Sequence, residues 1–235
     1  MIEGFKLTAE KIKRVIKLAV HLPDDYYTNN KQYPLLLVFD GGLFFSFLNE
    51  DNKEIDLKSI LDNLNKDMIV IGLFAPRINE WNISELNPYY SGTNDNVDIS
   101  YSSIFFDYIT NDFIPLLKQK YRFNDNISLM GIETGGAAVI SMLSRYNIYK
   151  NGIILSLNMP FINDLIIDDA NKIKNKNIYI YQGEKDLDIE SINRFLEIEK
   201  ALSNDNNLIL NYEKDDDNSI NSIVNNIIKG LEIII

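Results

Sequence analysis

Short apolar runs alternate along this chain with longer stretches in which apolar residues recur every three or four positions. Apolar runs of strand length that end in glycine or a polar residue are typical of strands buried on both faces of a sheet. They cover residues 35–39, 68–73, 127–130, 153–155 and 178–181. Helical spacing predicts helices over residues 57–64, 105–117, 137–143 and 220–231. This alternation predicts an α/β fold with a mostly parallel central sheet and helices on both faces.

The N-terminal pattern has a different period. Between residues 11 and 20, apolar Ile12, Ile16, Leu18 and Val20 share one face, and Lys11, Lys13 and Lys17 share the other. A period of two predicts a half-exposed strand. Because no helix separates the first strands, we expect them to form an antiparallel edge of the sheet. No linker or internal repeat divides the chain, so we expect residues 1–235 to form a single domain.

Charge narrows the range of partners. The chain has 235 residues, with Lys+Arg 23 against Asp+Glu 34, and therefore a formal net charge of −11. An acidic chain is poorly suited to nucleic acid or to an anionic membrane surface, both of which require Lys and Arg. The N-terminus lacks an apolar leader, and the longest apolar runs have only strand length. We expect a cytoplasmic protein that binds neither nucleic acid nor membrane.

The counts of two residue types exclude much chemistry. The chain contains no cysteine and one histidine. Thiolate nucleophiles, iron–sulfur ligation, cysteine-based zinc sites and multi-histidine metal sites are therefore excluded, and we expect neither a metal nor a cofactor. The one imidazole, His21, ends an early edge strand, where we expect it to be structural.

The candidate chemistry lies where an apolar run meets a helix. Gly131-Ile132-Glu133-Thr134-Gly135-Gly136 follows the strand over residues 127–130 and leads into the helix over residues 137–143. The spacing G-x-E-x-G matches a nucleophile elbow, in which the central residue occupies a sharp, strained turn between small neighbours. Here the central residue is Glu133 rather than a nucleophilic serine.

Several segments, in order along most of the chain, resemble one family. They are Val20-His21-Leu22-Pro23-Asp24-Asp25-Tyr26, Tyr33-Pro34-Leu35-Leu36-Leu37-Val38-Phe39-Asp40-Gly41-Gly42, Arg77-Ile78-Asn79-Glu80-Trp81, Phe113-Ile114-Pro115 with Tyr121-Arg122, and the elbow. Together they resemble the enterochelin-esterase-like esterases of the α/β-hydrolase fold, which are related to the esterase D group. The resemblance implies that fold and an ancestral esterase activity.

The resemblance also implies where the catalytic residues should lie. The family uses a serine at the elbow, a histidine before the last helix and an acid after the strand that ends here at Tyr181. Those positions hold Glu133, Asn218 and Asp186, respectively. The histidine of such a triad takes the proton of the serine, and the acid orients the imidazole. The nucleophile and the base are therefore missing, while the acid remains.

A former ester site would retain a set of lining residues. The resemblance implies that the oxyanion hole receives a backbone N–H after the strand that ends near Asp40. Trp81 lies in a long irregular stretch of the kind that often covers a site. The residues expected to line or approach a ligand are Gly41, Gly42, Thr134, Arg77, Glu80 and Trp81.

Glu133 is open to four interpretations. Its carboxylate could accept hydrogen bonds from unpaired N–H groups at the helix start, or it could lie in a retained pocket that binds a neutral or cationic ligand or a protein partner. It could act with Asp186 as an acid/base pair in a hydrolase, or another serine could sustain activity. We expect a catalytically degenerate esterase that acts as a binding relic, with the Glu133 and Asp186 hydrolase as the alternative. A structural or interaction subunit is a third class, and the terminal Ile233-Ile234-Ile235 suggests docking under the fold or a homodimer contact.

Overall fold

Eight strands form one sheet in the order β1-β2-β6-β3-β7-β8-β9-β10. The computed structural model describes residues 2–39, 47–48, 54–55, 57–74, 88–89, 99–185, 187–216 and 219–234. The strands of the sheet are β1 (Ile2–Ala9), β2 (Arg14–His21), β3 (Tyr33–Phe39), β6 (Ile69–Phe74), β7 (Phe123–Ile132), β8 (Tyr149–Leu155), β9 (Asn177–Gly183) and β10 (Asn207–Glu213). Pairing is antiparallel from β1 to β6 and parallel from β6 to β10. The predicted parallel sheet with an antiparallel N-terminal edge is confirmed.

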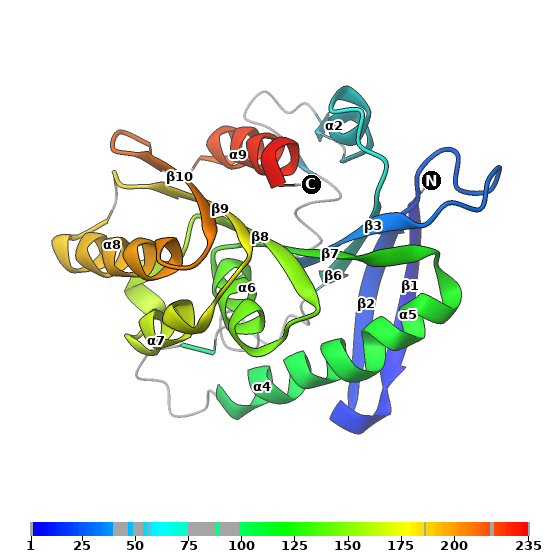
Figure 1. Ribbon diagram of the computed structural model, residues 1–235, viewed down its shortest axis with the longest axis horizontal. Helices are drawn as coiled ribbons and strands as arrows, with labels where there is room; N and C mark the ends of the chain where they lie inside the picture. Colours follow the sequence, from blue (N-terminus) through cyan, green and yellow to red (C-terminus); the bar gives the residue numbers. More distant parts are fainter. Residues whose placement is uncertain are drawn as a thin grey trace.

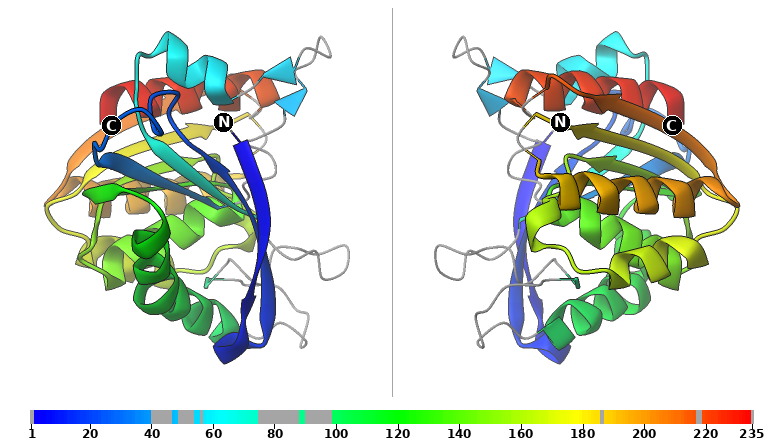
Figure 2. Two further views of the ribbon diagram at one scale, coloured as in Figure 1. Left: turned by 90° about the vertical axis from the view of Figure 1, so that its right-hand side faces the viewer. Right: turned by 90° about the vertical axis from the view of Figure 1, so that its left-hand side faces the viewer.

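Helices cover both faces of this sheet. Figures 1 and 2 show α2 (Leu57–Asn63) and α9 (Ile220–Ile234) over one face. The other face carries α4 (Ile99–Tyr108), α5 (Ile114–Lys120), α6 (Thr134–Arg145), α7 (Leu165–Lys172) and α8 (Ile189–Ser203). The short elements are η1 (Glu10–Ile12), the π-helical η2 (Ile109–Phe113), η3 (Met159–Phe161) and a separate pair of strands, β4 (Phe47–Leu48) and β5 (Glu54–Ile55).

The inner parallel strands are buried on both faces. In β9, Ile178 and Ile180 belong to the larger core, whereas Tyr179 packs in a second core together with residues of α9. The Tyr179 hydroxyl donates a hydrogen bond to Asn226 Oδ1 of α9 at 2.5 Å. At the end of α9, Ile234 packs against this second core while Ile233 is exposed. Double burial explains why these strands are continuous apolar runs in the sequence.

The predicted helix over residues 105–117 is interrupted by a wider turn. The structure has α4, η2 and α5 in direct succession, and the Ile114 N–H donates to the Ile109 carbonyl, five residues back. Pro115 follows, and it has no N–H to donate to the carbonyl four residues back. Single π turns of this kind occur inside α-helices, and here the helix continues through the turn into α5.

None of the helices in the described part of the chain is long and apolar enough to cross a membrane.

Candidate functional site

The turn between β7 and α6 has the geometry of a nucleophile elbow. Glu133 is the single residue between the two elements, with φ 50° and ψ −111°. A positive φ is costly for a residue with a side chain, typically about 1–3 kcal/mol. Two backbone hydrogen bonds hold the turn: the Glu133 N–H donates to the Leu155 carbonyl at 2.9 Å, and its carbonyl accepts from the Ala137 N–H at 3.3 Å. The strained presentation of position 133 is therefore intact although the residue is a glutamate.

Gly131 makes the sharp turn possible. A Cβ atom at this position would lie 2.1 Å from both the carbonyl carbon and the carbonyl oxygen of Gly135. Those atoms belong to the first turn of α6, so they cannot rotate away as a side chain can. The glycine two residues before Glu133 is thus required by the close approach of the strand to the helix.

The Glu133 carboxylate does not cap α6. Its side chain makes no hydrogen bond to the N–H groups at the start of the helix. The interpretation in which these N–H groups hold the carboxylate by hydrogen bonds is therefore wrong for α6. Glu133 is exposed to solvent. The protein atoms around its carboxyl group nevertheless remove part of the water from it, and this desolvation raises the pKa of the carboxyl group.

Thr134, an expected lining residue, is the first residue of α6 and is buried. The other expected site positions lie outside the described residues. They are Asp186 at the acid position, Asn218 at the histidine position, and Gly41, Gly42, Arg77, Glu80 and Trp81 as lining residues.

The segments that carry the acid and histidine positions are bonded to each other. The Glu184 N–H donates to the Glu213 carbonyl at 3.0 Å, and the Lys185 N–H donates to the Asp216 carbonyl at 3.1 Å. The chain leading to Asp186 and the chain leading to Asn218 therefore run together at the carboxyl edge of β9. That is also the edge at which Glu133 follows the end of β7, since β7, β8 and β9 are parallel neighbours.

His21 lies at the opposite end of the sheet. It pairs with Val70, which pairs with Leu36, which in turn pairs with Ser128 of β7. Ser128 precedes Glu133 by five residues, so His21 is displaced by about 16 Å along the strand direction and by three strand spacings of about 4.8 Å. The side chain is buried. Its imidazole therefore cannot act as a base on a group at position 133.

Two neighbouring features of the site were not anticipated from the sequence. Ser156, which follows β8 directly, also has a positive φ of 53° and is buried beside the elbow. Asp216 accepts a hydrogen bond from the Ser222 hydroxyl at 2.5 Å. Burial and the nearby Asp216 carboxylate raise the pKa of the Tyr181 hydroxyl. Because Tyr181 and Asp216 are distant in sequence, no local residue pattern indicates that they lie close together.

Within the described ranges, no group of three or more His, Asp or Glu side chains is arranged to hold a metal ion. At the start of α9, the Ser219 hydroxyl accepts a hydrogen bond from the Ser222 N–H at 3.3 Å, as in a helix cap.

The strain at Glu133 predicts a difference between two substitutions. Glu133→Gly and Glu133→Ala both remove the carboxylate, but only glycine adopts a positive φ readily. Glycine should relieve about 1–3 kcal/mol of strain, but it also costs about 0.5–1 kcal/mol because it adds conformational entropy to the unfolded chain. The glycine variant should therefore be about 1 kcal/mol more stable than the alanine variant. Urea unfolding of the two proteins measures this difference. Equal stabilities would mean that the turn is not strained.

Comparisons with known proteins agree with this geometry. An IroE-like serine hydrolase from Shewanella oneidensis superposes with a TM-score of 0.79 at 15% identity, over 99% of this chain and 79% of that one. An S-formylglutathione hydrolase from Agrobacterium tumefaciens gives 0.70 at 15% identity, over 99% and 93%. An enterochelin esterase from Shigella flexneri gives 0.72 at 12% identity, over 98% and 57%. At these identities the likeness establishes the α/β-hydrolase fold alone.

A family-level match goes further than the superpositions. No curated protein sequence matches the chain. The sequence profile of the family described as "Putative esterase" matches residues 9–219, which is most of the chain. The chain therefore belongs to this esterase family.

Proposed function

We propose that this chain is a catalytically degenerate member of its esterase family, and that it binds a small-molecule ligand or a protein partner at the former ester site. The observation that carries the proposal is Glu133 itself. It occupies the strained elbow position, where a serine esterase presents its nucleophile, and its carboxylate is not used to cap α6. Strained backbone conformations cluster at functional sites. Because the side chain of Glu133 does not cap α6, we expect this side chain to contact a ligand or a partner.

The lack of a general base near position 133 supports the absence of serine catalysis. Serine attack on an ester requires a base within hydrogen-bonding reach of the hydroxyl. The chain has one histidine, and the pairing of β2 holds it at the far end of the sheet. The position that corresponds to the catalytic histidine holds Asn218, whose amide cannot accept a proton near neutral pH.

The charge at the elbow indicates the class of ligand. Glu133 presents a carboxylate in a chain whose net charge is −11. An anionic ligand would be repelled there, so the site should select neutral or cationic ligands that can donate hydrogen bonds to the carboxylate.

An alternative function is favoured by one specific observation. Burial raises the pKa of Glu133, which is the direction that a carboxylic acid needs in order to deliver a proton near neutral pH. Glu133 and Asp186 could then act as an acid/base pair in a hydrolase without any serine nucleophile.

One experiment separates these functions. Wild-type protein and its Glu133→Gln variant are assayed with p-nitrophenyl acetate and, in parallel, treated with a fluorophosphonate probe that labels activated serines. We expect the wild type to hydrolyse the ester no faster than Glu133→Gln and to remain unlabelled. The lack of an activated nucleophile is the physical reason in both assays.

Each other outcome points to a different function. Hydrolysis without labelling that is lost in Glu133→Gln would support the carboxylate pair. Robust labelling of wild type at any serine would overturn the proposal of a degenerate site.

A further inference from the structure

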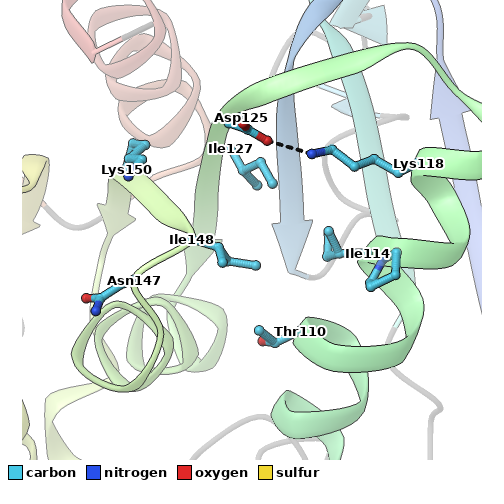
Figure 3. Close-up of a pocket in the computed structure, with 9 residues that line it drawn as sticks. Thr110, Ile114, Lys118, Asp125, Ile127, Asn147, Ile148 and Lys150 are labelled. Carbon is cyan, nitrogen blue, oxygen red and sulfur yellow. Dashed lines mark hydrogen bonds and ion pairs between the residues drawn. The ribbon is translucent and has the colours of Figure 1, made fainter.

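A cavity lies far from the elbow, at the opposite end of β7. It is formed by α5, the π-helical η2, the start of β7 and the connection from α6 to β8, and its volume is about 490 Å³. This volume falls within the roughly 300–1,000 Å³ typical of small-molecule sites. The lining residues are Thr110, Ile114, Pro115, Lys118, Asp125, Ile127, Asn147, Ile148 and Lys150 (Figure 3).

Three irregularities of the fold converge on this cavity. Thr110 belongs to the π turn η2. Asp125 lies at a register shift between β3 and β7, where Tyr33 pairs with Phe123 but Leu35 pairs with Ile127. Lys150 is the extra residue of β8, because Ile127 pairs with Tyr149 and Ser128 pairs with Asn151. Such wide turns and bulges redirect side chains, and they are over-represented at functional sites.

The middle of the cavity is apolar. Figure 3 shows Ile114 of α5 and Ile148 of the α6–β8 turn pointing toward one another from opposite walls, with Ile127 of β7 above them. Ile148 is 38% exposed, although it is a large apolar residue in a turn. Below this layer, the Thr110 and Tyr149 hydroxyls share a hydrogen bond of 2.8 Å, so Thr110 already has a polar partner.

The rim of the cavity is cationic in a protein that is otherwise strongly acidic. Lys118 Nζ contacts Asp125 Oδ1 at 2.5 Å, and the hydrogen bond and charge of Lys118, followed by the charge of Lys150, lower the pKa of Asp125. Lys150 is exposed, and its side chain makes no ion pair or hydrogen bond with any of the residues that the structure describes. The rim therefore has one carboxylate, that of Asp125, and two ammonium groups, those of Lys118 and Lys150, which leaves an excess positive charge.

We propose that this cavity binds a medium-chain carboxylate, with the acyl chain between Ile114, Ile127 and Ile148 and the carboxylate at Lys150. Burying each methylene of such a chain is favourable, and an unpaired lysine beside an apolar wall supplies the counter-charge. The anion preference is opposite to that expected at Glu133. The two sites are therefore distinguishable by the charge of the ligand.

The test is calorimetric titration of the full chain with octanoate, hexanoate and octylammonium. We expect octanoate to bind, hexanoate to bind more weakly by about fourfold per methylene removed, and octylammonium to bind at least tenfold more weakly than octanoate. Lys150→Gln should weaken octanoate binding about tenfold, through loss of a charged contact. Ile148→Ser should also weaken it, because the variant removes one apolar wall at an exposed turn that tolerates substitution.

Two matched variants locate the ligand. Lys17→Gln removes an exposed lysine of β2 on another part of the sheet, and Glu133→Gln alters the elbow; both should leave octanoate affinity within twofold of wild type. The proposal is overturned if octanoate does not bind, if octylammonium binds equally well, or if Lys150→Gln and Ile148→Ser have no effect. Loss of octanoate binding in Glu133→Gln would likewise overturn it, by assigning the ligand to the elbow.

Discussion

The double variant Glu133→Ser/Asn218→His is expected to hydrolyse p-nitrophenyl acetate at least about a hundredfold faster than the wild type, which is the size of effect that a positioned general base supplies. The reason is that the backbone of the elbow is already in place. Position 133 is held at φ 50° by bonds to Leu155 and Ala137, so a serine there would be presented without rearrangement. Initial rates at matched protein concentration measure the gain.

The single variants provide the controls for this gain. Glu133→Ser lacks a base and Asn218→His lacks a nucleophile, so each should remain close to the wild-type rate; effects of residues that act as a unit are not additive. A fluorophosphonate should label the double variant at position 133 and neither single variant. A folded double variant that is no faster than wild type would mean that degeneration extends beyond these two positions.

The sequence predicts the elbow well because its requirements are local. The spacing of Gly131, Glu133 and Gly135 specifies a strand, one strained residue and a helix within six positions, and the structure has that order. The buried strands could be predicted equally well from the sequence, since a strand that is buried on both faces is a continuous apolar run. The edge strands β1 and β10 were not predicted, because most of their residues are exposed or only partly buried and their apolar signal is correspondingly weak.

What could not be predicted depends on pairing between distant segments. The Glu133 carboxylate accepts no hydrogen bond at the start of α6, and residue types alone do not reveal the backbone and side-chain angles on which such a bond depends. The cavity beneath Lys150 depends on the register between β7 and β8 and on a π turn in a helix that precedes both. Each of these features has a weak local signal, and their convergence exists only in three dimensions.

Gly131→Ala is expected to destabilise the protein by about 3 kcal/mol or more, at the upper end of the range for overpacked sites. The added methyl group would lie 2.1 Å from the Gly135 carbonyl carbon and oxygen. Because these are backbone atoms at the start of α6, relief requires the whole helix to move away from β7. Interior residues of α6 are buried against the sheet, so that movement also breaks core packing. The free energy of unfolding from urea denaturation measures the effect.

Two other glycines show whether the backbone contact is the cause. A methyl group at Gly4 of β1 has no atom within 4 Å, so Gly4→Ala should change stability by no more than about 0.5 kcal/mol. At Gly152 the nearest atom is the Leu143 Cδ1 side-chain atom at 2.6 Å, which can move, so Gly152→Ala should have an intermediate effect. All three changes add the same methyl group to a strand. The loss of stability should therefore increase in the order Gly4, Gly152, Gly131, according to the atoms that the added methyl group contacts. Equal costs at Gly4 and Gly131 would contradict a tight elbow, and with it the structural basis for presenting Glu133.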